Sequence, residues 1–493
     1  MKNKKASLSV LAVAASLTLV ACGGGGSDNP APTPPPPVPE ETRVQDSRTS
    51  FAPATPPATT FAAMAAATGD TVDVSTTSRW AGVIGNAAYR VEVPPNWNGK
   101  LVMYAHGYAG TGNLLTVQNP QIRRYLIANG YAWAASSYSK NYYDVRVGVE
   151  DTNALANSFN KIAADNGRPL TTPSRIYITG VSMGGHITAA AIEDETFATA
   201  NNKVRYNGAV PMCGVLGDTE LFDYFGGAQV AAQALAGVPN SPITAWSTVQ
   251  PQVTAALFTQ FPATPVATTA QGAKFKSVVK NLTGGERPMF ELGLAYGGSF
   301  SAVYGVFGLD GTVNGILNKS SLDTTRFTYV IDNDPAGSAT LNASAQKLSP
   351  VADANRLRTD GLRWVPVTTG NIRVPVVTLH TLGDLYVPFS MEQIYQKRVT
   401  AKGNGNLLVQ RAIRGATHCD FTVAEQAEAF EAMIRWERDG VKPAGDDVVT
   451  AATVAQPSYG CRFTRNAIGA DDTASTAQLR TLIASSTAPC PAQ

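Results

Sequence analysis

The stretch Arg175-Ile-Tyr-Ile-Thr-Gly-Val-Ser-Met-Gly-Gly-His186 decides the fold of this chain. Residues 175–179 alternate apolar and polar side chains, which predicts a strand, and residues 187–193 predict a helix. Between them, Gly180 to Gly184 fits the pattern G-x-S-x-G with Ser182 at its centre. A tight turn between strand and helix exposes such a serine and turns the amides of the helix start toward it. A glycine-rich turn with an incidental serine is the alternative, so a catalytic Ser182 needs an acid and a histidine elsewhere.

Strand and helix patterns alternate on both sides of this stretch. Because parallel strands need helical crossovers, the alternation predicts an α/β fold with a mostly parallel sheet flanked by helices. The other expected strands are residues 79–84, 88–93, 100–105, 131–137, 206–213, 372–379 and 407–413. The other expected helices of the core are residues 121–129, 151–166, 393–399 and 423–438.

An insertion at residues 216–365 interrupts the alternation. It is far longer than an ordinary loop and must carry its own structure, for which residues 221–235 and 244–260 supply helical patterns. We expect a cap over the carboxyl edge of the sheet, and an accessory domain packed elsewhere is the alternative. The core then consists of residues 61–215 and 366–445, followed by a C-terminal extension of residues 446–493.

The chain begins with a targeting segment at residues 1–22. A basic start and a short apolar run lead into Leu19-Val-Ala-Cys22, which matches a lipobox, and a Gly- and Pro-rich tether follows at residues 23–60. The segment resembles the signal peptides of bacterial lipoproteins, which implies that Cys22 is acylated and that lipid anchors the protein to the cell envelope. Gly23 favours the outer membrane or the cell surface, and an ordinary secretory signal is the alternative.

The composition of the chain limits the classes of partner and cofactor that we expect. A net charge of +2 without a lysine or arginine cluster argues against nucleic acid. The histidines have no zinc-ligand spacing and no C-x-x-C pair occurs, so we expect neither a metal nor a required cofactor. Export makes disulfides plausible for the remaining cysteines, and three connectivities are open. Cys461 with Cys490 would hold the C-terminal tail, and Cys213 with Cys419 would tie the core near the catalytic loop.

A serine hydroxyl needs a base within hydrogen-bond reach. We select His418, because its loop lies between a strand and an amphipathic helix and can bring an imidazole to the edge of the sheet. His106 is expected to shape a turn, and His186 to pack on the helix after Ser182. His380 ends a strand and could line the site without being the base.

The base in turn needs an acid to orient it. Asp384, in Leu382-Gly-Asp-Leu-Tyr-Val-Pro388, directly follows the strand at residues 372–379 and can meet His418 from the neighbouring loop. Asp218 follows the strand at residues 206–213 and is the competing candidate.

The order Ser182, Asp384, His418 resembles the α/β-hydrolase fold, whose triad follows Ser, Asp, His. His106-Gly107 after a strand resembles the oxyanion loop of that family. The resemblance implies that the amides of Met183 and of Tyr108, or a near neighbour such as Gly107, form the oxyanion hole.

A narrower resemblance concerns the histidine loop. His418-Cys419 resembles the His-Cys half of the feruloyl esterase and tannase family, in which a disulfide joins the residues beside the serine and the histidine. Val181 stands before Ser182 here, so that bridge cannot form and the likeness is partial.

These features predict a serine hydrolase that cleaves carboxylic esters of small molecules. A peptidase of the same fold acting on short peptides and a non-catalytic surface binding module are the alternatives. The aromatic residues Tyr296, Phe300, Tyr304 and Phe307 of the insertion suggest an apolar or aromatic substrate group, although such residues are more often core.

Overall fold

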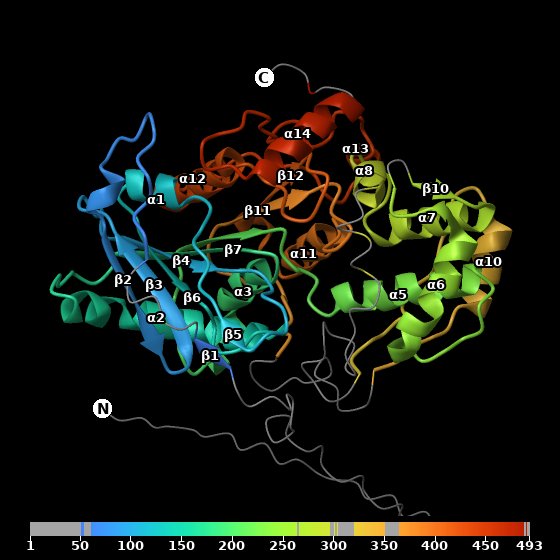
Figure 1. Cartoon of the computed structure of the whole chain (residues 1–493), viewed down its shortest axis with the longest axis horizontal. Coiled ribbons are helices and arrows are strands. Elements are labelled where there is room, and N and C mark those ends of the chain that lie inside the picture. Colours follow the sequence, from blue (N-terminus) through green and yellow to red (C-terminus); the bar gives the residue numbers. More distant parts are fainter. Residues whose placement is uncertain are drawn as a thin grey trace, which may run out of the picture. The chain divides into compact units, whose positions relative to one another are not determined.

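Figure 1 shows the computed structural model of the chain, which describes residues 51–53, 61–263, 266–295, 300, 303, 320–350, 364–487 and 490. The targeting segment with Cys22 and most of the tether lie outside these residues. Tyr296, Tyr304 and Phe307 also lie outside them, whereas Phe300 is buried. Within the described residues, no helix combines the length and the apolar character that crossing a membrane requires.

Eight strands form one sheet in the order β12-β11-β8-β7-β4-β6-β3-β2. The strands from β12 to β6 run parallel, and β3 is antiparallel to both of its neighbours. The predicted α/β class with a mostly parallel sheet is therefore confirmed. The strands are β2 (Ser78–Ile84), β3 (Ala87–Val93), β4 (Lys100–Ala105), β6 (Ala132–Ser136), β7 (Arg175–Val181), β8 (Gly208–Met212), β11 (Val376–Thr381) and β12 (Leu408–Ile413).

Helices cover both faces of this sheet (Figure 1). The helices of the core are α1 (Arg123–Ala128), α2 (Val145–Asp165), α3 (Met183–Ala191), α4 (Asp194–Thr199), α11 (Ser390–Ala401) and α12 (Val423–Asp439). Strand β4 illustrates why two covered faces are needed. Leu101 and Met103 belong to one hydrophobic cluster with residues of α2, α3 and α11, whereas Val102 and Tyr104 belong to a second with residues of α1 and α12. Successive side chains of a strand point to opposite faces, so the buried positions 101–105 of β4 are all apolar or aromatic.

The start of β11 differs from the sequence expectation. The strand begins at Val376, not at Ile372, which forms an isolated bridge with Glu193. Pro375 stands directly before the strand and has no N–H for the ladder, so regular pairing starts after it.

The described part of the insertion consists mainly of helices: α5 (Glu220–Leu235), α6 (Trp246–Leu257), α7 (Ala270–Leu282), α8 (Phe290–Ala295) and α10 (Pro335–Ser344). The expected helix at residues 244–260 ends at Leu257, because the next residues form β9 (Phe258–Gln260), which pairs with β10 (Ala267–Thr268). Val230, Val278, Tyr329 and Leu341 form a separate cluster between these elements. The insertion thus carries its own small core.

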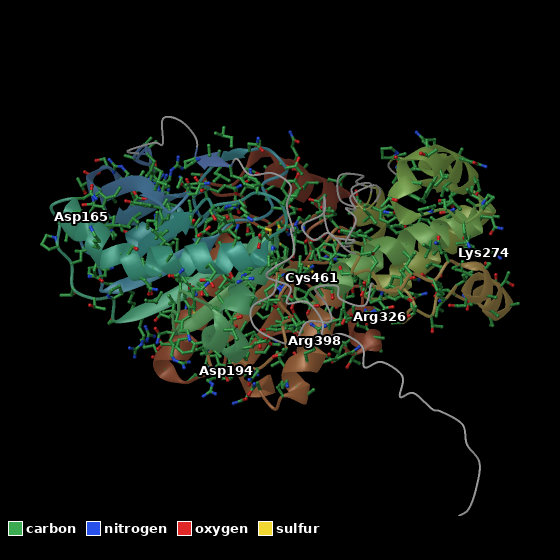
Figure 2. The ribbon with its side chains drawn as sticks, turned by 90° about the horizontal axis from the view of Figure 1, so that it is seen from below. Asp165, Asp194, Lys274, Arg326, Arg398 and Cys461 are labelled. Atoms are coloured by element: carbon green, nitrogen blue, oxygen red, sulfur yellow. A yellow bond between two sulfur atoms is a disulfide. The ribbon has the colours of Figure 1, made fainter. Side chains whose placement is uncertain are left out.

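The remaining elements are short or follow the core. They are β1 (Ala52–Pro53), β5 (Leu114–Leu115), the 3₁₀ turns η2 (Val74–Thr76), η3 (Ile243–Ala245) and η6 (Gly405–Leu407), and the helices α13 (Ala451–Val454) and α14 (Ala474–Ser486) of the C-terminal extension. Cys461 forms a disulfide with Cys490 beyond α14. Charged side chains such as Asp165 and Lys274 lie on the outside of the molecule (Figure 2).

Candidate active site

Ser182 occupies a sharp turn between β7 and α3. Its backbone has φ 59° and ψ −123°, a conformation that a non-glycine residue rarely adopts. The turn is possible because the backbones approach closely: a Cβ on Gly184 would lie 2.0 Å from the carbonyl oxygen of Ala105, and one on Gly180 would lie 2.3 Å from that of Gly184. The serine amide also donates to the carbonyl of Met212 on β8, at 3.0 Å.

The side chain of Ser182 meets His418. Its Oγ makes no hydrogen bond to the backbone of α3 as a helix cap and lies 2.8 Å from His418 Nε2. His418 Nδ1 lies 2.5 Å from Oδ2 of Asp384. The Asp384 carboxylate is fully buried, whereas the imidazole is 21% exposed. A serine, an imidazole and a buried carboxylate therefore form one continuous chain of contacts.

Asp384 is oriented by its own turn. Its Oδ1 accepts from the amide of Tyr386 at 3.0 Å and from that of Val387 at 2.9 Å. These bonds leave Oδ2 directed at His418. The acid loop also contacts the insertion, because Tyr224 of α5 donates its hydroxyl to the carbonyl of Leu385.

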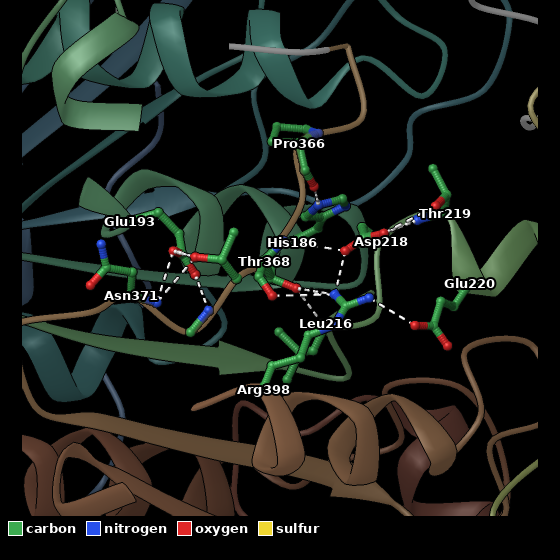
Figure 3. A network of polar contacts seen from close by, with 12 residues as sticks. His186, Glu193, Leu216, Asp218, Thr219, Glu220, Pro366, Thr368, Asn371 and Arg398 are labelled. Atoms are coloured by element: carbon green, nitrogen blue, oxygen red, sulfur yellow. Dashed lines mark hydrogen bonds and ion pairs between the residues drawn. The ribbon is translucent and has the colours of Figure 1, made fainter. Parts of the chain in front are cut away.

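The competing acid, Asp218, is committed to a different network (Figure 3). Its Oδ2 accepts from Arg398 of α11 at 2.5 Å and from the Thr368 amide at 3.2 Å. Arg398 also reaches Glu220 at the start of α5, and Glu220 pairs in addition with Arg326 of the insertion (Figure 2). This network joins the beginning of the insertion to the chain that returns from it.

Two of the other histidines hold structural positions. His186 is fully buried between the hydroxyl of Tyr143 and the carbonyl of Pro366, and burial lowers its pKa to about 4 (Figure 3). His106 stacks on Tyr138 at 4.1 Å, and burial also lowers its pKa. Both rings are therefore neutral at physiological pH. These positions agree with the expectation that His106 shapes a turn and that His186 packs on the helix after Ser182.

The last histidine, His380, lies next to the acid and makes no hydrogen bond to Ser182 in the described structure. It is fully buried on β11, and its Nε2 lies 3.9 Å from Oδ2 of Asp384. Its Nε2 donates to the carbonyl of Val387 at 2.7 Å.

The oxyanion candidates surround the serine. A Cβ on Gly107 would lie 3.2 Å from the Cβ of Ser182 and 3.7 Å from its Oγ, so the backbone after β4 passes directly beside the hydroxyl. His106 Nδ1 contacts the Gly107 carbonyl at 2.7 Å and holds the peptide that carries the Tyr108 amide. Met183 is the first residue of α3, where helical N–H groups have no intrahelical acceptor.

A disulfide joins Cys213 to Cys419 beside the imidazole. Cys213 follows β8, Cys419 follows His418, and both have positive φ angles, of 42° and 56°. The Cys419 sulfur lies 3.4 Å from His418 Nε2. The bridge thus ties the histidine loop to the strand next to the elbow, without a cysteine at position 181. These sulfurs and His418 are grouped closely enough for a metal, but the disulfide removes both thiolates.

Two contacts of the histidine loop have no signal in the sequence. The ring of Tyr386 packs edge-on against His418 at 5.6 Å. Arg480 of α14 donates to the carbonyls of Arg414 and Asp420, at 2.7 and 2.9 Å, and to Glu425. An arginine near the C-terminus belongs to no motif, so its partners can be found only in the folded chain.

The chain has the α/β-hydrolase fold. This architecture is indicated by the order of the strands and by the sharp turn at Ser182. The order of Ser182, Asp384 and His418 along the chain is also typical of it.

Comparisons with known proteins add distant likenesses. No family model matches the sequence. A stretch of 96 residues, 19% of the chain, is 31% identical to o-phthalyl amidase of Xanthobacter agilis. The chain matches about a fifth of the length of that curated relative (21%).

Solved structures with a similar fold include proteins of Aspergillus oryzae, Candida antarctica and Pyrococcus horikoshii. Feruloyl esterase B from Aspergillus oryzae is 16% identical with a TM-score of 0.42, covering 79% of this chain and 88% of that one. Candida antarctica lipase A is 15% identical with a TM-score of 0.35, covering 83% and 85%. Pyrococcus horikoshii acylaminoacyl peptidase is 12% identical with a TM-score of 0.38, covering 76% and 43%.

Proposed function

We propose that this protein is a serine hydrolase that cleaves carboxylic esters through an acyl-enzyme on Ser182. The observation that carries the proposal is the continuous contact of Ser182 with His418 and of His418 with the buried Asp384. This is the arrangement that activates a hydroxyl toward an acyl carbon.

In the first step, Ser182 Oγ attacks the carbonyl carbon of the ester while His418 Nε2 takes the hydroxyl proton. Asp384 accepts from His418 Nδ1, which selects the tautomer with a free Nε2 and stabilises the imidazolium. The amides of Met183 and Tyr108 would donate to the oxyanion, and losing one such donor typically costs about 3 kcal/mol of transition-state stabilisation.

In the second half, His418 gives its proton to the departing alcohol and then activates a water molecule. That water attacks the acyl carbon, the bond to Ser182 Oγ breaks, and the proton returns to the serine. The acid and the alcohol leave as products, and Ser182 is regenerated. These steps require no external cofactor.

Amide hydrolysis is the second candidate. The match to o-phthalyl amidase, at 31% identity over 96 residues, favours testing it. The same three residues could act on an amide, but His418 would have to protonate an amine as it leaves. A peptidase acting on short peptides falls within this class, and a non-catalytic binding module would have no turnover at all.

One panel separates these readings. Matched p-nitrophenyl esters and p-nitroanilides of the same acyl groups are offered to the wild-type protein, to Ser182→Ala and to Ser174→Ala. Ser174 is exposed and directly precedes β7, whereas Ser182 follows that strand. Ser174→Ala therefore shows the effect of removing a serine hydroxyl away from the site.

We expect ester turnover in the wild type and in Ser174→Ala, and loss of it in Ser182→Ala. Cleavage of the anilides alone would assign an amidase. No turnover together with no labelling of Ser182 by a fluorophosphonate would reject the enzyme and leave the binding module.

We also propose that Cys22 is acylated and anchors the protein to the bacterial envelope. The lipobox supports this, and the two disulfides of the described chain fit an oxidising compartment. Labelled palmitate should enter the wild type and not Cys22→Ser, and equal labelling of both would refute the anchor.

A further inference from the structure

A second histidine and a second carboxylate lie buried behind the acid of the triad. His380 is on β11 and Glu392 is in the first turn of α11, and neither side chain is more than 1% exposed. The steps of ester hydrolysis described above use neither of them. Burying two ionisable groups costs free energy of desolvation unless the groups pair with each other or with other polar groups.

Both ring nitrogens of His380 face acceptors. Nε2 lies 2.7 Å from the carbonyl oxygen of Val387, and Nδ1 faces Oε1 of Glu392 at 3.3 Å. A neutral imidazole carries only one N–H, so it would leave one of these oxygens facing a lone pair. A proton on Nδ1 would make the contact with Glu392 an ion pair, which no other hydrogen bond of these two atoms replaces in the described structure.

The other oxygen of Glu392 indicates where that proton resides. Oε2 accepts from the Thr378 hydroxyl at 2.6 Å and from the side-chain amide of Gln410. Two donors on one oxygen favour the ionised carboxylate, which places the proton on His380. Burial by itself lowers the pKa of His380, but the hydrogen bond and charge of Glu392 and the charge of Asp384 together raise it above its usual value.

The pair reaches the triad by two routes. His380 Nε2 lies 3.9 Å from Oδ2 of Asp384, the oxygen that contacts His418. His380 also holds the carbonyl of Val387, the residue whose amide donates to Asp384 Oδ1. The first route acts through charge and the second through the shape of the acid turn.

Other ionisable groups surround this pair and the acid. Arg287, before α8, is buried and donates to the carbonyl of Leu382; burial lowers its pKa to about 10, so it stays cationic. The carboxylates of Asp384 and Glu392 also act on four tyrosines, whose pKa values are raised mainly by burial, so these tyrosines are neutral: Tyr224, Tyr386, Tyr395 and Tyr459. Arg287 and a protonated His380 thus both interact with the charge of Asp384.

We propose that His380 and Glu392 form a buried imidazolium–carboxylate pair that positions Asp384 toward His418. Both are positioning residues, since neither touches the reacting atoms. The proposal rests on the proposed function only where turnover is measured, because the charge of His380 can be observed without any substrate.

The first test reads that charge directly. The protein has four histidines, so a spectrum of histidine labelled with ¹⁵N in the Ser182→Ala protein is simple, and His380→Asn identifies the signal. We expect both ring nitrogens of His380 to be protonated at pH 7. A neutral ring would overturn the proposal whether or not the protein hydrolyses esters.

The second test reads the link to the triad. Glu392→Gln removes the charge of the partner, so the ring of His380 becomes neutral but can still donate to Val387. Without that cation beside Asp384 Oδ2, the acid turn holds the imidazole of His418 less well, so kcat should fall about 10-fold while KM stays unchanged.

Glu193→Gln is the matched control. Glu193 is also buried and also accepts several hydrogen bonds, from Thr369, Gly370 and Asn371, but these belong to the chain that returns from the insertion (Figure 3). Its loss should leave kcat and KM unchanged. A folded Glu392→Gln protein with the kcat of the wild type would reduce the pair to a structural contact, and if that variant does not fold, the charge measurement decides.

Discussion

The elbow and the histidine loop meet at one hydrogen bond but are held in different ways. The elbow is held by backbone: Gly180 and Gly184 let β7 and α3 approach the carbonyl of Ala105, and the Ser182 amide donates to β8. All of these partners lie within the elbow or on the strands that flank β7 in the sheet. Its conformation is therefore set largely by the local sequence.

The histidine loop is held by side chains that come from distant parts of the chain. The Cys213–Cys419 disulfide spans 206 residues, and Arg480 reaches the loop from α14. Thr381 adds a bond from its hydroxyl to the carbonyl of Thr417. The backbone of the loop also contacts the acid loop, where the Gly383 amide donates to the carbonyl of Gly415 at 2.9 Å. The more distant ties matter because a displacement of about 1 Å at a catalytic group can lower the rate about 100-fold.

The contrast predicts that the elbow tolerates no added atoms. A Cβ at position 184 would lie 2.0 Å from the Ala105 oxygen and 2.7 Å from that of His106, both backbone atoms that cannot move aside. We expect Gly184→Ala to lose about 3 kcal/mol or more of unfolding free energy and all measurable turnover. Urea unfolding and ester turnover measure both. Gly112→Ala, where no atom lies within 4 Å of the added Cβ, should match the wild type.

Replacing the acid should abolish catalysis with the backbone intact. In Asp384→Asn the neutral amide no longer holds the imidazole of His418 in the tautomer with a free Nε2. We therefore expect kcat to fall by about 10⁴-fold. Asp218→Asn leaves Arg398 less well paired and should reduce stability with little loss of kcat. Steady-state kinetics and thermal unfolding of the two variants decide the assignment; a larger kcat loss in Asp218→Asn would reverse it.

Removing the disulfide beside His418 should have a smaller effect on turnover. In Cys213→Ala/Cys419→Ala the loop loses its tie to β8, and we expect kcat/KM to fall by about 10- to 100-fold. Cys461→Ala/Cys490→Ala removes the other disulfide and should keep its kcat/KM. Equal kcat/KM in both double variants would show that the bridge does not position the imidazole.

The contribution of Arg480 should be the smallest of the four. Arg480→Lys keeps the charge but loses the planar fork that reaches two carbonyls, so the unfolding free energy should fall by about 1–3 kcal/mol. Turnover should fall less than in the Cys213/Cys419 variant. Arg435→Lys changes an exposed pair with Glu431 and controls for the substitution, since such pairs are worth about 0.5 kcal/mol. Indistinguishable unfolding curves of these two variants would exclude Arg480 as a tie.

Much of the core could be predicted from the sequence because its signals are local. Alternating strand and helix patterns located the strands of the sheet to within a few residues, apart from the start of β11, where Pro375 delays the ladder. The elbow was visible as a five-residue pattern in its proper context. Ser182, Asp384 and His418 could be selected because each directly follows a strand, or lies in the loop after one.

The surroundings of the triad could not be predicted, because they depend on partners that only the fold brings together. Nothing near His380 in the sequence indicates that Glu392 and Val387 will face its two ring nitrogens. The rejection of Asp218 as the acid likewise depends on Arg398, which is 180 residues away.

The sequence by itself determined the α/β class, the elbow and the order of the three polar residues. Periodicity, turn chemistry and the ends of strands are properties of short segments, and they persist whatever the rest of the chain does. Only the tertiary structure decided which carboxylate meets His418, which disulfide and arginine hold its loop, and what lies behind Asp384. Those contacts join residues far apart in the chain, and their energies exist only once the core has formed around them.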